Sequence, residues 1–266
     1  MNTIIATLIV SATLALILGF LLGFFKKVFF VPVDEKVAAV RECLPGANCG
    51  GCGYAGCDGY AEAVAAGIAP ADACSAGGEA VIKSICSLMG VEANVTPQIV
   101  VTACQGSNDC AKPKGYYNGV KTCLAVKLTI NGNKMCSYGC IGYGDCVEVC
   151  KFDAISIGKN GLPVIDTEKC VGCGMCAKVC PQSVLSKVAK DAKHAFIMCN
   201  NKEPKGPHII KNCSVACIKC GICEKTCPTG AIHFVNNLPA IDISKCTNCG
   251  DCVAKCPKKV IKLLNK

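Results

Sequence analysis

The sequence has no tryptophan, and aromatic residues make up only 5% of its 266 residues. Its three histidines, His194, His208 and His233, are isolated from one another and from any nucleophile pattern, so we expect them at the surface. No GxGxxG motif opens a strand–helix unit and no phosphate-binding loop is present, so we expect NAD and other nucleotides to bind elsewhere. No residue resembles a general acid or base. These absences disfavour a chain that transforms a bound organic substrate by itself.

Cysteine is what the sequence has in excess: 27 residues, about one in ten, far above ordinary usage. Such a content is typical either of a secreted disulfide scaffold or of an intracellular metal protein. An odd number of cysteines fits disulfide pairing poorly. The length suits two to four small domains, whose modest apolar cores need metals or cross-links for stability.

The spacing of the cysteines favours metal. Three segments contain the run C-x2-C-x2-C-x3-C-P, which is typical of bacterial ferredoxins with two [4Fe–4S] clusters. In such a run the first three cysteines hold one cluster and the fourth holds its neighbour. The runs are Cys170, Cys173, Cys176, Cys180; Cys217, Cys220, Cys223, Cys227; and Cys246, Cys249, Cys252, Cys256.

The C-terminal half is an internal repeat of about 77 residues. Lys159–Pro181 matches Val235–Pro257, and Cys150–Ile157 matches Cys227–Phe234. Each unit predicts a loop, a short helix and a short strand, followed by the same again. We therefore predict an α+β chain with a transmembrane helix, a small helical [4Fe–4S] domain and two tandem ferredoxin-like modules. The predicted boundaries are 1–27 for the anchor, 34–92 for the helical domain, 93–135 for a connecting segment, 136–188 for module 1, 189–212 for a linker and 213–266 for module 2.

Crossed ligation assigns most of the ligands in these modules. Three sets are complete, and the remaining one has Tyr143 where the repeat has Cys220. The complete sets are Cys150, Cys170, Cys173, Cys176; Cys217, Cys220, Cys223, Cys256; and Cys227, Cys246, Cys249, Cys252.

The incomplete set contains Cys140, Cys146 and Cys180. Tyrosine is a poor ligand for a soft iron–sulfur core, which prefers thiolate. Cys136, four residues before Cys140, is the nearest replacement, and we hypothesise that it completes this set. The alternatives are a three-iron cluster or no cluster. Cys213 aligns with Cys136 although its own run is complete, so a cysteine at this position can have another role.

The connecting segment supplies three more cysteines, Cys104, Cys110 and Cys123, which with one partner could hold a sixth cluster. Cys199, Cys213 and Cys136 are the candidates for that partner. The alternative is that these thiols are structural. We therefore expect five to six [4Fe–4S] clusters in the chain.

The N-terminal cysteines follow a different pattern, Cys49-x2-Cys52-x4-Cys57 with Cys74 further on. The interspersed glycines let the backbone fold tightly around a cluster. Helices are expected at about 58–66 and 79–89. A four-cysteine zinc site is the alternative, although zinc pairs are usually spaced more tightly. Two further cysteines, Cys43 and Cys86, are not used in this set. Cys86 is expected to be a buried thiol.

The segment Ile4–Phe25 contains 22 residues without a charge, enough to span a bilayer as a helix. Lys26 and Lys27 follow at once, and no basic side chain precedes the segment. The positive-inside rule then places the C-terminal domains in the cytoplasm of a single-pass protein of the cell membrane. A cleaved signal peptide is the alternative, but a basic start and a small-residue cleavage site are missing.

The basic residues are unevenly distributed: residues 34–92 carry a net charge of −5 and residues 93–266 carry +12. A basic chain often binds nucleic acid. Here, however, each oxidised cluster with its thiolates adds about two negative charges, which offsets the excess. No basic run with interleaved aromatics is present, so we expect no nucleic-acid partner.

Several features together resemble the B subunits of the Rnf complex. These are the stretch NCGGCGYAGC (48–57) with its later Cys-x-x-Gly-Gly (74–78), the membrane helix before it and the ferredoxin repeats after it. The second module and the stretch ACQGSNDC (103–110) are similar to the longer clostridial and acetogen form. The resemblance covers essentially the whole chain. Tyr143, and Lys151 in place of the proline after Cys150, depart from the pattern.

The Rnf complex is a membrane ferredoxin:NAD oxidoreductase that couples electron transfer to Na⁺ or H⁺ movement. The resemblance implies that reduced ferredoxin, or flavodoxin, delivers electrons to the C-terminal modules. It also implies that the N-terminal cluster passes them to membrane subunits and that NAD binds to another subunit. Competing interpretations are a stand-alone membrane-anchored polyferredoxin, a redox-sensing or assembly scaffold, and a related complex that reduces a redox regulator.

Overall fold

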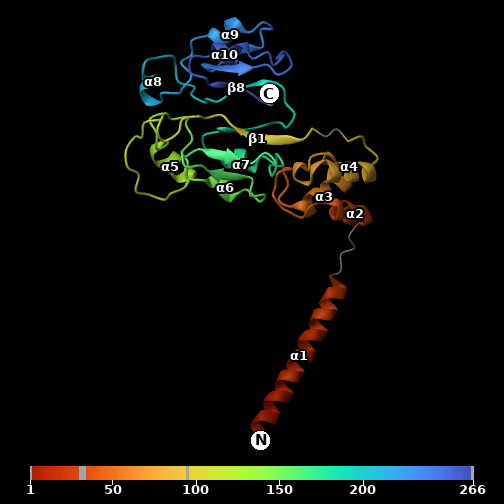
Figure 1. Ribbon diagram of the computed structural model, residues 1–266. Helices are drawn as coiled ribbons and strands as arrows, with labels where there is room; N and C mark the ends of the chain where they lie inside the picture. The colour runs from red at the N-terminus through yellow and green to blue at the C-terminus, as the bar shows by residue number, and fades with distance from the viewer. Residues whose placement is uncertain (1, 30–33, 94–95, 265–266) are drawn as a thin grey trace.

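The long N-terminal helix α1 (Asn2–Val28) stands apart from the rest of the chain (Figure 1). The computed structural model describes residues 2–29, 34–93 and 96–264. Within these residues, Ile4–Val28 is the one helix long and apolar enough to cross a membrane, with a mean hydropathy of 2.6 and no burial against the protein. The predicted apolar helix is confirmed. Such an exposed apolar surface needs an apolar environment, which the core of a bilayer offers.

A small helical domain follows the anchor. Asp34 begins α2 by accepting the Lys36 N–H at 2.8 Å, which satisfies a free donor of the first turn. Tyr60 is fully buried at the centre of the domain, and its hydroxyl donates to the carbonyl of Pro70 at 2.8 Å. The two helices predicted here are confirmed, and Cys86 is buried as expected. The elements are α2 (Glu35–Cys43), α3 (Cys57–Ala65), the 3-10 turn η1 (Ser75–Gly77) and α4 (Gly78–Met89).

Each ferredoxin-like module is built on two antiparallel strand pairs. In module 1, β1 pairs with β4 and β2 with β3, and in module 2, β5 pairs with β8 and β6 with β7. The short strands expected within the matching stretches Cys150–Ile157 and Cys227–Phe234 correspond to β2 and β6. The strands are β1 (Gln98–Thr102), β2 (Ile155–Ile157), β3 (Pro163–Ile165), β4 (Leu185–Ala189), β5 (Ala195–Ile197), β6 (Ile232–Val235), β7 (Leu238–Ile241) and β8 (Ile261–Leu263).

One short helix follows the second position of every run. In each case the residue before the helix is a glycine with a positive φ, between 76° and 91°, a conformation that side chains disfavour. Gly144 keeps this role even though its run has Tyr143 in place of cysteine. The helices are α6 (Asp145–Glu148), α7 (Met175–Val179), α9 (Ile222–Thr226) and α10 (Asp251–Lys255).

The segments 93–135 and 189–212, expected to be a connector and a linker, each contribute a strand to one of the modules. Strand β1 lies in the first and closes the sheet of module 1, while β5 lies in the second and closes the sheet of module 2. Two further helices lie in these segments, α5 (Cys123–Ile130) and α8 (His208–Asn212). Local spacing could not reveal this, because both strand pairings join residues far apart in the sequence.

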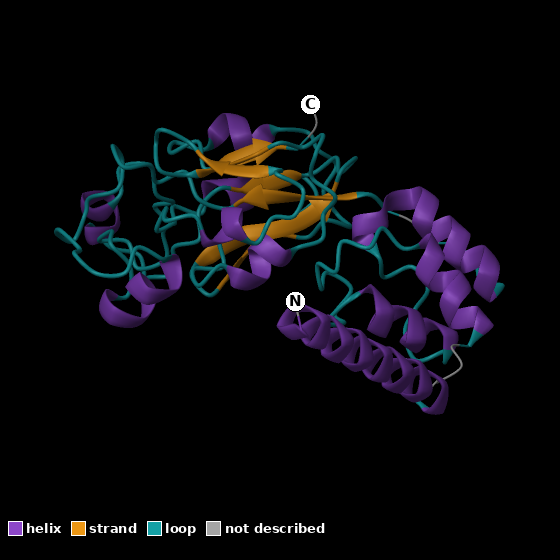
Figure 2. Cartoon of the chain, turned by 90° about the horizontal axis from the view of Figure 1, so that it is seen from below, coloured by secondary structure: helices purple, strands orange, loops and turns teal. Residues whose placement is uncertain are grey.

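The modules lie side by side, and the helical domain packs beside module 1 (Figures 1 and 2). In the view of Figure 2 the strands occupy the middle of the molecule, between the helical domain and the loops around α5 and α8. One expectation fails: His194 is buried rather than exposed, with its Nδ1 2.9 Å from the Ala195 carbonyl oxygen. It lies next to β5, where the strand pairing covers it.

Candidate iron–sulfur sites

The structure brings the four predicted N-terminal cysteines together. Cys49 and Cys52 lie in the loop before α3, Cys57 is its first residue, and Cys74 precedes η1. Asn48 fixes the loop, because its Oδ1 accepts the Cys57 N–H at 2.7 Å. Burial raises the pKa of Cys74, and the negative charges of Cys52, Cys57 and Cys49 raise it further.

The three complete ferredoxin sets also converge. Two of them line separate pockets with empty volumes of 340 and 360 Å³. The first pocket has Cys217, Cys220, Cys223 and Cys256, and the second has Cys150, Cys170, Cys173 and Cys176. In the third set, burial raises the pKa of Cys252 to about 11, and the charges of Cys249, Cys246 and Cys227 contribute.

At the incomplete set, Cys123 takes the place predicted for Cys136. Cys123, Cys140, Cys146 and Cys180 line one pocket of 360 Å³. Burial raises the pKa of Cys140 and of Cys146 to about 12, and Cys123 and Cys180 add to both shifts. Cys136 lines a different pocket, so the structure does not bring it to the set for which it was predicted.

Cys123 reaches this pocket because hydrogen bonds hold the start of α5 against the start of α6. The backbone N–H groups of Cys123 and Leu124 donate to the Asp145 carboxylate at 2.7 and 3.0 Å. The pKa of the Cys123 thiol is raised by burial, while the nearby backbone N–H groups of Asp145, Tyr143 and Gly144 lower it. The thiol thus lies over the backbone of residue 143, where the run lacks its own cysteine. Sequence reasoning singled out Cys123 but could not place it.

Replacing Asp145 with alanine should therefore loosen the position of Cys123. The change leaves two backbone donors without their charged acceptor, and hydrogen bonds to charged groups contribute about 1.5–3 kcal/mol each. We expect faster hydrogen exchange at the N-terminus of α5 and faster loss of iron under air. Asp145→Asn, which keeps one acceptor oxygen, should lie between wild type and alanine. The exposed Asp109→Asn is a control, and equal behaviour of all variants would contradict a role for Asp145.

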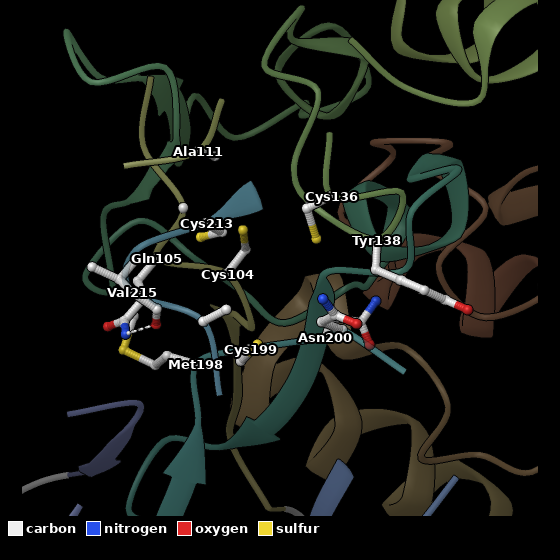
Figure 3. A pocket seen from close by; sticks show the side chains of 14 residues that line it. Cys104, Gln105, Ala111, Cys136, Tyr138, Met198, Cys199, Asn200, Cys213 and Val215 are labelled. Carbon is white, nitrogen blue, oxygen red and sulfur yellow. Dashed lines mark hydrogen bonds between the residues drawn. The ribbon is translucent and has the colours of Figure 1, made fainter. Parts of the chain in front are cut away.

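A further four-cysteine pocket lies between the modules, lined by Cys104, Cys136, Cys199 and Cys213 (Figure 3). Its empty volume is 340 Å³. The group predicted from sequence, Cys104, Cys110 and Cys123 with one partner, is therefore split. Cys123 belongs to the pocket beside α6, and Cys110 lines neither pocket.

Among residues 2–29, 34–93 and 96–264, no group of three cysteine, histidine or acidic side chains is placed to hold a single metal ion. In a four-iron cluster each thiolate binds a different iron atom, so four cysteines around one pocket suit such a cluster.

The N-terminal cysteine loop touches module 1. A Cβ atom on Gly51 would lie 3.0 Å from the Cβ and 3.1 Å from the carbonyl oxygen of Cys173, so a side chain here would push Cys173 by a few tenths of an ångström. Next to it, Lys178 Nζ donates to the Gly50 carbonyl at 3.3 Å. Cys49 is near enough for its charge to raise the pKa of Cys173, although burial is the larger cause. The loop that carries Cys49 and Cys52 is thus in direct contact with a cysteine of module 1.

Three family models match the chain. An Fe-S cluster model matches residues 44–76, a 4Fe-4S binding domain matches residues 163–186, and a 4Fe-4S dicluster domain matches residues 216–260. These matches cover part of the helical domain and part of each module. The chain therefore binds iron–sulfur clusters.

Curated relatives match along nearly the whole chain. The B subunit of the Na(+)-translocating ferredoxin:NAD(+) oxidoreductase complex of Acetobacterium woodii is 42% identical over 92% of this chain and 74% of its own length. The B subunit of the proton-translocating ferredoxin:NAD(+) oxidoreductase complex of Clostridium ljungdahlii is 42% identical over 92% of this chain and 87% of the relative. The B subunit of the ion-translocating oxidoreductase complex of Methanosarcina acetivorans is 40% identical over 98% of this chain and 99% of the relative.

Proposed function

The chain belongs to the family of B subunits of ion-translocating oxidoreductase complexes, and we propose that it relays electrons from reduced ferredoxin, or flavodoxin, to the membrane subunits. It is an iron–sulfur electron-transfer subunit of a multi-subunit complex. Its partners would include the membrane subunits and a separate NAD-binding subunit. Clusters bound to the chain would accept and release single electrons, which is the chemistry that the polypeptide itself lacks.

Five sets of four cysteines would hold these clusters. The proposed assignment differs from crossed ligation in the ferredoxin runs at one place only, where Cys123 replaces the missing run cysteine. The sets are Cys49, Cys52, Cys57, Cys74; Cys123, Cys140, Cys146, Cys180; Cys150, Cys170, Cys173, Cys176; Cys217, Cys220, Cys223, Cys256; and Cys227, Cys246, Cys249, Cys252.

The contact between Gly51 and Cys173 is the observation that carries the proposal. A relay needs cysteine sets on successive domains to lie close together, and this contact joins module 1 to the domain next to the membrane anchor. Within module 1, Cys176 is near enough to Cys146 to raise the pKa of that buried thiol, so its two sets are also neighbours. The two sets of module 1 would therefore lead on to the helical domain.

The membrane anchor supports a direction for electron transfer and a position for the domains relative to the membrane. Helix α1 precedes the helical domain by only a few residues, so that domain would lie nearest the membrane. Lys26 and Lys27 at the end of α1 favour a cytoplasmic position for the remaining domains. The modules, which are farther along the chain and carry the basic excess, would face an acidic donor such as ferredoxin.

Membranes from a strain lacking only this chain test the proposal. We expect ferredoxin-dependent NAD reduction to be lost and to return when the wild-type gene is supplied. Survival of the activity would contradict the proposal and favour a stand-alone membrane-anchored polyferredoxin. A related complex that reduces a redox regulator is the other alternative, and it would leave NAD reduction intact while the regulator stays oxidised.

A further inference from the structure

The pocket between the modules is built from four separate segments. Cys104 follows β1, Cys136 precedes the first cysteine run, Cys199 follows β5, and Cys213 ends α8. The family models match residues 44–76, 163–186 and 216–260, and all four cysteines lie outside these ranges. Figure 3 shows these side chains around one space.

The two modules contribute to this pocket in the same way. Cys104 and Cys199 each follow the strand that closes a module's sheet. The Cys104 thiol accepts the N–H of Cys140 at 3.5 Å, and the Cys199 thiol accepts the N–H of Cys217 at 3.4 Å. Since Cys140 and Cys217 are the equivalent first cysteines of the two repeats, the pocket has an approximate twofold arrangement.

The flanking contacts repeat this arrangement. Gln105, next to Cys104, donates from Nε2 to the carbonyl of Lys258 in module 2 at 3.2 Å. Asn200, next to Cys199, donates from Nδ2 to the carbonyl of Gln182 in module 1 at 2.8 Å. Lys258 and Gln182 both follow the proline that ends a cysteine run. Equivalent hydrogen bonds beside the pocket therefore join each module to the other.

The second pair of thiols is related in the same way. Cys136 lies four residues before Cys140, and Cys213 lies four residues before Cys217. Both thiols line the pocket together with Cys104 and Cys199.

The pocket has the size of the ferredoxin sets, and its cysteines are more deeply buried than theirs. Its empty volume of 340 Å³ equals that around Cys217 and is close to the 360 Å³ around Cys170. Three of its four cysteines are buried, with exposed fractions of 6–8%: Cys104, Cys136 and Cys213. A pocket of this size enclosed by four thiols is suited to the same group as its neighbours.

Two buried lysines, Lys134 and Lys219, indicate independently that a negatively charged group binds nearby. Lys134 is only 4% exposed, and its Nζ donates to the carbonyl of Gly106, which lies beside the Cys104 and Cys213 thiols. Lys219 is 8% exposed, and its Nζ has no hydrogen-bond partner among the described residues. A buried ammonium group is costly unless negative charge lies nearby, and around Lys219 the groups that supply it are Glu203 and the thiols of Cys217, Cys199 and Cys136. An iron–sulfur cluster with four thiolates carries net negative charge and would compensate the ammonium group.

We propose that Cys104, Cys136, Cys199 and Cys213 together ligate a sixth [4Fe–4S] cluster, shared by the two modules. This inference rests on the proposed function and adds to it the link between the modules. The site adjoins the set of Cys140 through Cys104 and the set of Cys217 through Cys199. It therefore joins two modules whose own sets would otherwise be separate, and Cys136 serves this site rather than the run with Tyr143.

Iron and acid-labile sulfide in the anaerobically purified full chain test the site. The wild type should contain about 24 iron atoms, four for each of six clusters. Cys104→Ser in module 1 and Cys213→Ser in module 2 should each lower the content by about one to four atoms, according to whether a three-iron cluster remains. Because both residues serve one cluster, the double variant should lose no more than about four atoms in total. Electron paramagnetic resonance should show the same signal missing from all three.

Cys110→Ser is the matched control, because Cys110 lies in the same segment as Cys104 but lines none of the cysteine pockets described above. It should keep the wild-type iron content. A wild-type content near 20 atoms would overturn the proposal, as would unchanged iron in the serine variants. A double variant that loses about eight atoms would also overturn it, because the thiols would then serve two clusters. None of these results removes the other five clusters, so they are distinct from failure of the proposed function.

Discussion

Replacing Cys123 with alanine is expected to lower the iron content by about one to four atoms per chain, according to whether a three-iron cluster remains. Cys123 completes the pocket of Cys140, Cys146 and Cys180, and no other thiol of the described residues lines it. Iron analysis and electron paramagnetic resonance of the anaerobic chain measure the effect. The buried Cys86→Ala should leave the iron content unchanged, since Cys86 lies in the helical domain outside every proposed set.

A second substitution should reverse the loss. Tyr143 occupies the run position that Cys220 has in module 2, and the Cys123 thiol lies over the backbone at residues 143–145. Tyr143→Cys in the Cys123→Ala background would therefore return a thiolate to nearly the same place. We expect most of the lost iron to be regained. If Cys123→Ala keeps all its iron, Cys123 is not a ligand and the assignment fails, whatever the second substitution does.

The parts of the fold that were predicted correctly are those with local signals. The apolar run of α1, the glycine before each short helix and the three complete cysteine runs are each written within a few residues. The helices at α3 and α4 and the strands β2 and β6 follow from the same kind of pattern. Such features depend on backbone conformation and nearest neighbours, so the sequence alone reveals them.

The features that were missed depend on long-range contacts. Cys123 is brought to the Cys146 pocket by hydrogen bonds to Asp145, 22 residues away, and no spacing rule describes this approach. The pocket of Cys104 and Cys199 forms only when β1 and β5 pair with strands at the far end of each module. The repeat did contain one useful sign, because Cys213 aligned with Cys136 beside an intact run. Equivalent cysteines in two repeats indicate a shared site better than a local substitution.

Replacing Gly51 with leucine is expected to slow electron transfer from module 1 to the helical domain several-fold, because electron transfer between clusters falls steeply with their separation. A side chain at Gly51 would press on the backbone carbonyl of Cys173, which cannot rotate away as a side-chain tip can. The loop that carries Gly51 and module 1 must then shift apart. Rapid freezing after reduction, followed by electron paramagnetic resonance of the N-terminal cluster, measures the rate.

The iron content of Gly51→Leu should equal that of wild type, because the change moves one domain against the other and removes no thiol. Gly59→Leu is the matched control: it lies in the same domain, on α3, and a Cβ atom there would have nothing within 4 Å. An unchanged rate in Gly51→Leu with full iron content would mean that electrons do not cross at this contact. The slow rate would instead make the Gly51–Cys173 contact the crossing point, because the cysteine sets of the two modules would still be reduced normally.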